Sequence, residues 1–122
     1  MFTLIHTCDE FVVISKKAGV SFHGGAGAPS LDDAVRARLG ITELYALHRL
    51  DKLTSGLLVF ARTRAAVREL ALQFRERRMA KFYLALGGPH PKKKQGVISG
   101  DMKKGRDGAW ILARTHERPA VT

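Results

Sequence analysis

A single cysteine is present in this 122-residue sequence, and its isolation excludes two kinds of small scaffold. Cys8 has no second cysteine with which to form an intrachain disulfide, and no neighbouring cysteine with which to build a zinc knuckle. We therefore predict that Cys8 is a small apolar side chain at the end of a strand.

Long apolar runs are also missing. No stretch approaches the roughly 18 residues that a membrane-spanning helix requires. The first six residues lack a basic segment followed by a signal-type apolar stretch, and the chain contains no internal repeat, heptad seam or low-complexity tract. We expect a cytoplasmic, globular chain, and residues 1–122 are enough for one domain with no separate second domain.

Acidic residues are scarce, with 11 Asp and Glu against 21 Lys and Arg, so the net charge is +10. Residues 1–51 hold five basic and six acidic groups, net −1, whereas residues 52–122 hold sixteen basic and five acidic groups, net +11. Such an uneven field is typical of a protein that binds a polyanion, with nucleic acid first and an anionic membrane surface second. A solubilising surface is the alternative.

Two strands and a helix are predicted in the first forty residues. Apolar patterning indicates strands over residues 3–6 and 11–14. A glycine-rich loop follows His23, and it lacks the spacing of a dinucleotide or P-loop motif, so His23 is interpreted as a loop histidine. Ser30 is a suitable N-cap for a helix that Gly40 ends, and its apolar stripe consists of Leu31, Val35 and Leu39.

The middle of the chain predicts a strand and a second helix. Residues 57–61 are apolar without alternation, which favours a central strand covered on both faces. Thr63 is placed to cap a helix over residues 64–78, whose apolar face would consist of Val67, Leu70, Ala71 and Phe74.

Beyond the second helix, residues 81–86 alternate in character. Phe82, Leu84 and Leu86 would point to the core, with Lys81 and Tyr83 together on the other face. Residues 97–99 and 109–113 suggest a further hairpin with Trp110 in the core, and residues 117–122 suggest the start of another strand.

A polar cluster lies directly before the central strand. His48, Arg49 and Asp51 fall within four residues, and a carboxylate beside a guanidinium has its ionised, nucleophilic form favoured. Functional groups commonly lie on loops held by rigid elements. A structural ion pair at a turn is the alternative.

Three blocks of this sequence resemble the RluA-type pseudouridine synthase family. The polar cluster and the residues after it look like the family signature, residues 9–20 resemble its opening strand and turn, and residues 81–85 match its Lys-x-Tyr-x-Ala block. In the opening turn, Ser15 and Lys17 replace the usual Asn and Pro. A later block of the family, Gly-Arg-x-His-Gln-x-Arg, is absent from these residues.

The resemblance implies a mixed α/β (α+β) fold, namely the N-terminal part of a pseudouridine synthase catalytic domain. That fold has a largely antiparallel, twisted sheet with packed helices, truncated here. The implied activity is isomerisation of uridine to pseudouridine in ribosomal or transfer RNA, without a metal or other cofactor. The missing block, Gly-Arg-x-His-Gln-x-Arg, would supply a basic partner for the catalytic Asp. This chain alone is therefore expected to be inactive or nearly so.

The resemblance also implies roles for individual residues. Asp51 would be the nucleophile, attacking either uracil or the ribose, and Tyr83 would lie against the uracil. Arg49 would fill the gap left by a flipped uridine. The other predicted RNA-binding residues are His48, which we expect to shape the loop, together with Arg62 and Lys81.

Two other functions fit parts of this sequence. A non-catalytic RNA-binding module would show the same charge, so it remains the alternative to the enzyme. A phosphotransferase is disfavoured because the kinase glycine loop and Asp-Phe-Gly are both absent from the sequence.

Overall fold

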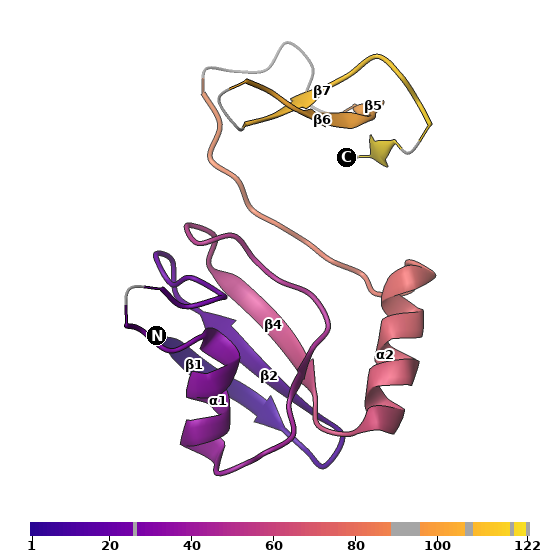
Figure 1. Cartoon of the computed structure of the whole chain (residues 1–122). Coiled ribbons are helices and arrows are strands. Elements are labelled where there is room, and N and C mark those ends of the chain that lie inside the picture. The colour runs from indigo at the N-terminus through magenta and orange to yellow at the C-terminus, as the bar shows by residue number, and fades with distance from the viewer. Residues whose placement is uncertain (26, 89–95, 107–108, 118, 122) are drawn as a thin grey trace. The chain divides into compact units, whose positions relative to one another are not determined.

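The computed structural model describes residues 1–25, 27–88, 96–106, 109–117 and 119–121. It contains two compact units, Met1–Phe82 and Tyr83–Thr122 (Figure 1). Whether the chain forms one domain with no separate second domain stays a prediction. In the described part of the chain, no helix combines the length and the apolar character needed to cross a membrane.

The first unit is built on a four-stranded antiparallel sheet with the order β1-β2-β4-β3. β2 and β4 are paired along their whole length, from Phe11 opposite Ala61 to Lys16 opposite Gly56. β4 thus lies inside the sheet, as predicted. The strands are β1 (Phe2–Thr7), β2 (Phe11–Lys16), β3 (Tyr45–Ala46) and β4 (Gly56–Ala61).

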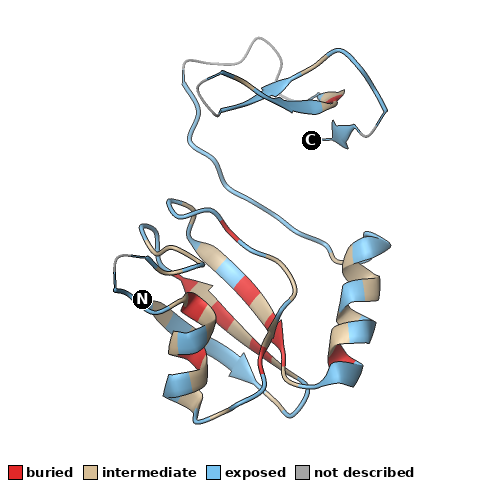
Figure 2. Cartoon of the chain, viewed as in Figure 1, coloured by how far each residue is buried: buried red, intermediate tan, exposed pale blue. Residues whose placement is uncertain are grey.

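Helix α1 (Leu31–Leu39) covers one face of this sheet (Figure 1). The Ser30 hydroxyl caps the helix by accepting from the Asp33 amide at 3.3 Å, and Gly40 ends it with a φ of 64°. Figure 2 shows buried positions on α1, β2 and β4. The core consists of Val12, Ile14, Leu31, Val35, Leu44, Leu50, Leu58 and Phe60.

The other face of β4 is less covered than the sequence predicted. Leu58 and Phe60 are fully buried, but Leu57 is 58% exposed. On the same face as Leu57, however, Val59 is half-buried and Ala61 is fully buried. The prediction of a strand covered on both faces is therefore confirmed only in part, because the second face is uncovered at Leu57.

Helix α2 (Arg64–Arg75) begins as expected at Thr63, whose hydroxyl accepts from the Ala66 amide at 3.1 Å. It ends three residues earlier than predicted, where Arg77 adopts a φ of 57°. Ala66 is buried and Ala71 is exposed, so the predicted apolar face is only partly used.

The strand predicted over residues 81–86 is not formed. Phe82 is 93% exposed, and Leu84 and Leu86 are fully exposed (Figure 2). Alternation alone does not make a strand, because the backbone also needs hydrogen-bonding partners. Among the described residues, no strand pairs with this segment.

The second unit contains two short antiparallel pairs, β5 with β8 and β6 with β7. The predicted hairpin is present, but its first strand lies at residues 102–104 instead of 97–99. Trp110 is 64% exposed, so its assignment to the core was wrong. The strands are β5 (Ser99–Gly100), β6 (Met102–Lys104), β7 (Trp110–Leu112) and β8 (Ala120–Val121).

Candidate functional site

Asp51 lies on an exposed turn directly after a residue of the core. Leu50 is 9% exposed and packs in the core cluster, whereas Asp51 is exposed. The Thr54 amide donates to the Asp51 carbonyl at 3.1 Å, and the Gly19 amide donates to the Lys52 carbonyl at 2.8 Å. The carboxylate is thus open to solvent on a backbone that is fixed on both sides.

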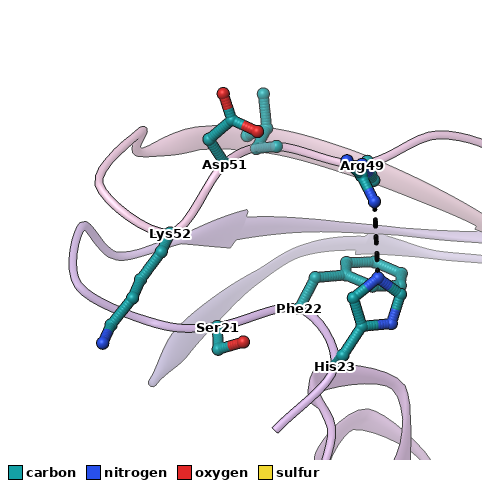
Figure 3. A pocket seen from close by; sticks show the side chains of 7 residues that line it. Ser21, Phe22, His23, Arg49, Asp51 and Lys52 are labelled. Atoms are coloured by element: carbon teal, nitrogen blue, oxygen red, sulfur yellow. Dashed lines mark hydrogen bonds between the residues drawn. The ribbon is translucent and has the colours of Figure 1, made fainter. Parts of the chain in front are cut away.

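A small pocket of about 150 Å³ adjoins this turn (Figure 3). A cavity of about 150 Å³ can hold one benzene molecule, so the pocket has room for a single small ring. Two segments line it, residues 21–23 before α1 and residues 49–52 before β4. Figure 3 shows the Lys52 side chain pointing away from Asp51.

Arg49 faces His23 across the pocket, with Nη1 of Arg49 at 3.5 Å from Nε2 of His23 (Figure 3). Among the described residues, no ion pair within 4.0 Å includes the Asp51 carboxylate. The guanidinium thus contacts the histidine in this structure. His23 was interpreted from the sequence as a loop residue, and nothing in the local pattern indicates an arginine partner 26 positions away.

His48 connects the segment before Asp51 to β4. Its Nε2 accepts a hydrogen bond from the Val59 amide at 3.1 Å, so the neutral ring carries its proton on Nδ1. The ring also lies 4.9 Å from that of Phe74 in α2. Burial lowers the pKa of His48, and the charge of Lys81 lowers it further, which favours this neutral form.

Lys81 is also a neighbour of Phe74. Its Nζ is 5.6 Å from the ring centroid of Phe74, a cation–π distance. His48 and Lys81 therefore both contact the Phe74 ring of α2. The structure brings Lys81 close to His48, and its RNA contact stays a prediction.

Lys16 is a further residue at the site whose role the sequence did not suggest. Its side chain is fully buried, and Nζ donates to the carbonyls of Lys17 at 3.2 Å, Val20 at 2.9 Å and Lys52 at 3.1 Å. Burial lowers the pKa of Lys16, and the negative charge of Asp51 acts in the opposite direction. A sequence signal exists, because Lys16 continues the buried alternation of Val12 and Ile14.

Asp51 and Arg49 are the predicted site residues that line the pocket, and His48 and Lys81 are not among its lining residues. Arg62 follows the far end of β4, and its Nη1 donates to the Cys8 carbonyl at 2.6 Å. The five steps of β4 separate that end from Gly56 by about 17 Å. Tyr83 is 65% exposed and belongs to the other unit, so its pairing with Asp51 stays a prediction.

In the described part of the chain, no group of three or more His, Cys, Asp or Glu side chains is placed to hold a metal ion. The chemical groups at the site are a carboxylate, a guanidinium and an imidazole around a small pocket. In general, a carboxylate can act as a nucleophile, and a guanidinium or an imidazole can bind a base or a phosphate.

Comparison with known proteins agrees with the predicted resemblance. The family model described as RNA pseudouridylate synthase matches residues 10–121. A relative named "Uncharacterized RNA pseudouridine synthase" from Haemophilus influenzae is 41% identical over 98% of this chain and 53% of its own length. "Ribosomal large subunit pseudouridine synthase C" from Vibrio parahaemolyticus is 32% identical over 98% of this chain and 38% of its own. "Dual-specificity RNA pseudouridine synthase RluA" from Pasteurella multocida is 40% identical over 79% and 44%.

Comparison of the fold with solved structures identifies the same family. The structure of "Human RNA Pseudouridylate Synthase Domain Containing 1" superposes with a TM-score of 0.77 and 25% identity over 99% of this chain and 49% of its own length. The chain thus spans about half the length, or less, of the relatives that it matches. The mixed α/β fold and the RluA-type resemblance are confirmed. The chain belongs to the RNA pseudouridylate synthase family.

Proposed function

We propose that this chain carries the nucleophile of an RNA pseudouridine synthase, and that the nucleophile is Asp51. The observation that supports this best is the position of its carboxylate. It is exposed beside a ring-sized pocket, on a turn anchored to the core by Leu50, within the region that the family model matches. A surface carboxylate without such an anchor would not be held in a defined geometry.

In the proposed reaction, the bond between the ribose C1′ and N1 of uracil breaks, uracil rotates, and a bond between C1′ and C5 forms. The proton on C5 is lost and N1 gains one, so the product is an isomer and no cofactor is needed. The Asp51 carboxylate attacks either the ribose or uracil, and it leaves again when the C5 product is released.

Arg49 would replace the stacking of the flipped uridine, because a planar guanidinium stacks on bases. His23 contacts this guanidinium at 3.5 Å. The proposed substrate is structured ribosomal or transfer RNA, and the proposed compartment is the cytoplasm. The excess of basic over acidic residues, net +10, supports a polyanionic substrate.

The decisive experiment compares Asp51→Asn with Asp9→Asn in a catalytically competent form of the enzyme. Both changes remove one exposed carboxylate with little change of shape, but Asp9 lies outside the pocket. We expect Asp51→Asn to abolish pseudouridine formation, measured by pseudouridine mapping of cellular RNA, and Asp9→Asn to retain it. Melting temperature and RNA affinity should survive both changes, since an exposed charge contributes about 1 kcal/mol or less.

An active Asp51→Asn enzyme would reject the assignment, as would an inactive one that is also unfolded. Retained RNA binding without any turnover by the unmodified enzyme would favour the alternative, a non-catalytic RNA-binding module.

A further inference from the structure

Lys16 has an environment that a charged side chain rarely occupies. It is fully buried at the end of β2, in the same row as Val12 and Ile14, whose side chains form the core. Lysine is almost never fully buried unless its ammonium is paired. Among the described residues, it is the one charged side chain that is buried.

The hydrogen bonds of Lys16 indicate its protonation state. An ammonium group has three N–H donors, and Nζ has three carbonyl partners, at 2.9, 3.1 and 3.2 Å. A neutral amine would have two donors and a lone pair, and the lone pair would face one of these carbonyl oxygens. The geometry therefore fits the charged form, although burial lowers the pKa of this lysine.

The three carbonyls belong to two segments far apart in the sequence. Lys17 and Val20 lie in the loop after β2, whereas Lys52 follows Asp51 directly and is 36 positions from Lys16. The Lys52 carbonyl also accepts from the Gly19 amide at 2.8 Å, so two donors fix this one oxygen. Gly19 has a φ of 83°, which suits glycine and allows the loop to reach the Lys52 carbonyl.

We propose that Lys16 is a positioning residue for Asp51: its buried ammonium ties the turn that carries the carboxylate to the end of β2 and to the loop that lines the pocket. Its relevance to catalysis rests on the proposed role of Asp51, whereas the tie itself does not. The amine is fully engaged with backbone oxygens, so Lys16 acts through the turn and neither accepts a proton nor attacks substrate.

The same ammonium contributes charge as well as contacts. The negative charge of Asp51 favours the charged form of Lys16 and opposes the effect of burial, so the two side chains interact electrostatically. A neutral side chain of the same length would lose both the hydrogen bonds to the three carbonyls and the electrostatic interaction with Asp51. The core packing of the aliphatic stem would remain.

The first test uses the unmodified protein. With 15N-labelled lysine, NMR should show Lys16 as a slowly exchanging ammonium with couplings across hydrogen bonds to the Val20 and Lys52 carbonyls. A neutral amine, or an ammonium exchanging as fast as that of exposed Lys17, would overturn the proposal.

The second test compares Lys16→Met with Lys17→Met by amide hydrogen exchange. Lys16→Met keeps a similar buried stem and removes the ammonium. Exchange should rise about tenfold or more at Gly19 and Thr54, because a hydrogen bond from a charged donor is worth about 1.5–3 kcal/mol. Exchange in the middle of β2 should change little, and Lys17→Met should leave all these amides unchanged.

A uniform rise at all amides would show that Lys16 serves global stability alone and would overturn the proposal, as would no change at Gly19 and Thr54. If Lys16→Met does not fold, Lys16→Cys in a Cys8→Ser background, alkylated with bromoethylamine before refolding, restores an ammonium at the same reach. If that form refolds with wild-type exchange rates at Gly19 and Thr54, the result supports the proposal that the ammonium holds the turn. If the wild-type exchange rates are not restored, the proposal is refuted. Neither test requires turnover, so failure of the proposed function would be seen separately.

Discussion

His48 provides a quantitative test of how the segment before Asp51 is held. His48→Ala removes the acceptor of the Val59 amide and the ring contact with Phe74. Val59 is half-buried, so losing that hydrogen bond should cost about 1–2 kcal/mol, and the ring contact about 0.5–1 kcal/mol. We expect a loss of about 2 kcal/mol in the free energy of unfolding, which lowers Tm by about 8 °C.

His48→Gln is the matched control, because the side-chain oxygen of Gln can also accept a hydrogen bond from the Val59 amide but does not titrate. It should lose less than half as much stability as His48→Ala at about pH 7.5. Urea denaturation followed by circular dichroism measures both variants. A His48→Ala protein as stable as wild type would refute the role of the Val59 hydrogen bond.

The pH dependence of the same pair has a defined sign. The pKa of His48 is lowered in the folded state from its ordinary 6.5, by burial first and by Lys81 second, so the unfolded chain binds this proton more readily. The contribution of His48 is therefore complete above pH 6.5 and is lost as pH falls through the lower folded value. Wild type should lose stability relative to His48→Gln between about pH 7.5 and 5, and a constant difference would contradict this reasoning.

Three further outcomes are expected. Gly24→Ala should destabilise the first unit by about 1–3 kcal/mol in urea denaturation, because Gly24 has a φ of 71° and a Cβ would lie 2.6 Å from the Ala28 carbonyl oxygen. Gly27→Ala, with a φ of 84° but no atom within 4 Å of its Cβ, should cost less, and equal losses would contradict the clash. Phe60→Ala should cost about 3–5 kcal/mol because Phe60 is fully buried, whereas Leu57→Ala on the same strand should cost about 0.5 kcal/mol; similar values would refute the assigned core. RNA affinity should fall with salt with a log–log slope of roughly −0.7 per single-strand phosphate neutralised, and a flat titration would exclude phosphate-dominated binding.

Local chemistry allowed much of the first unit to be predicted from the sequence. Ser30 and Gly40 set the ends of α1 through a side-chain cap and a left-handed residue, both of which depend on neighbouring atoms alone. The placement of Asp51 just before an internal strand was also predictable, since a polar cluster adjoining an apolar run marks the end of a buried element.

Contacts between distant segments could not be predicted in this way. The alternation over residues 81–86 indicated a strand, but Leu84 is fully exposed because strand formation depends on a partner that local sequence does not specify. Trp110 was also predicted to lie in the core but is 64% exposed, because burial of a large ring requires a second layer against which to pack.

The composition and motifs by themselves determined the family, the polyanion-binding charge and the carboxylate proposed for catalysis. Tertiary structure decided how that carboxylate is held. The buried ammonium of Lys16 reaches the Lys52 carbonyl across 36 positions, and His23 meets Arg49 across 26. Both contacts exist because the pairing of β2 with β4 brings the ends of these strands together, and such closure of distant segments depends on the whole sheet rather than on any local pattern.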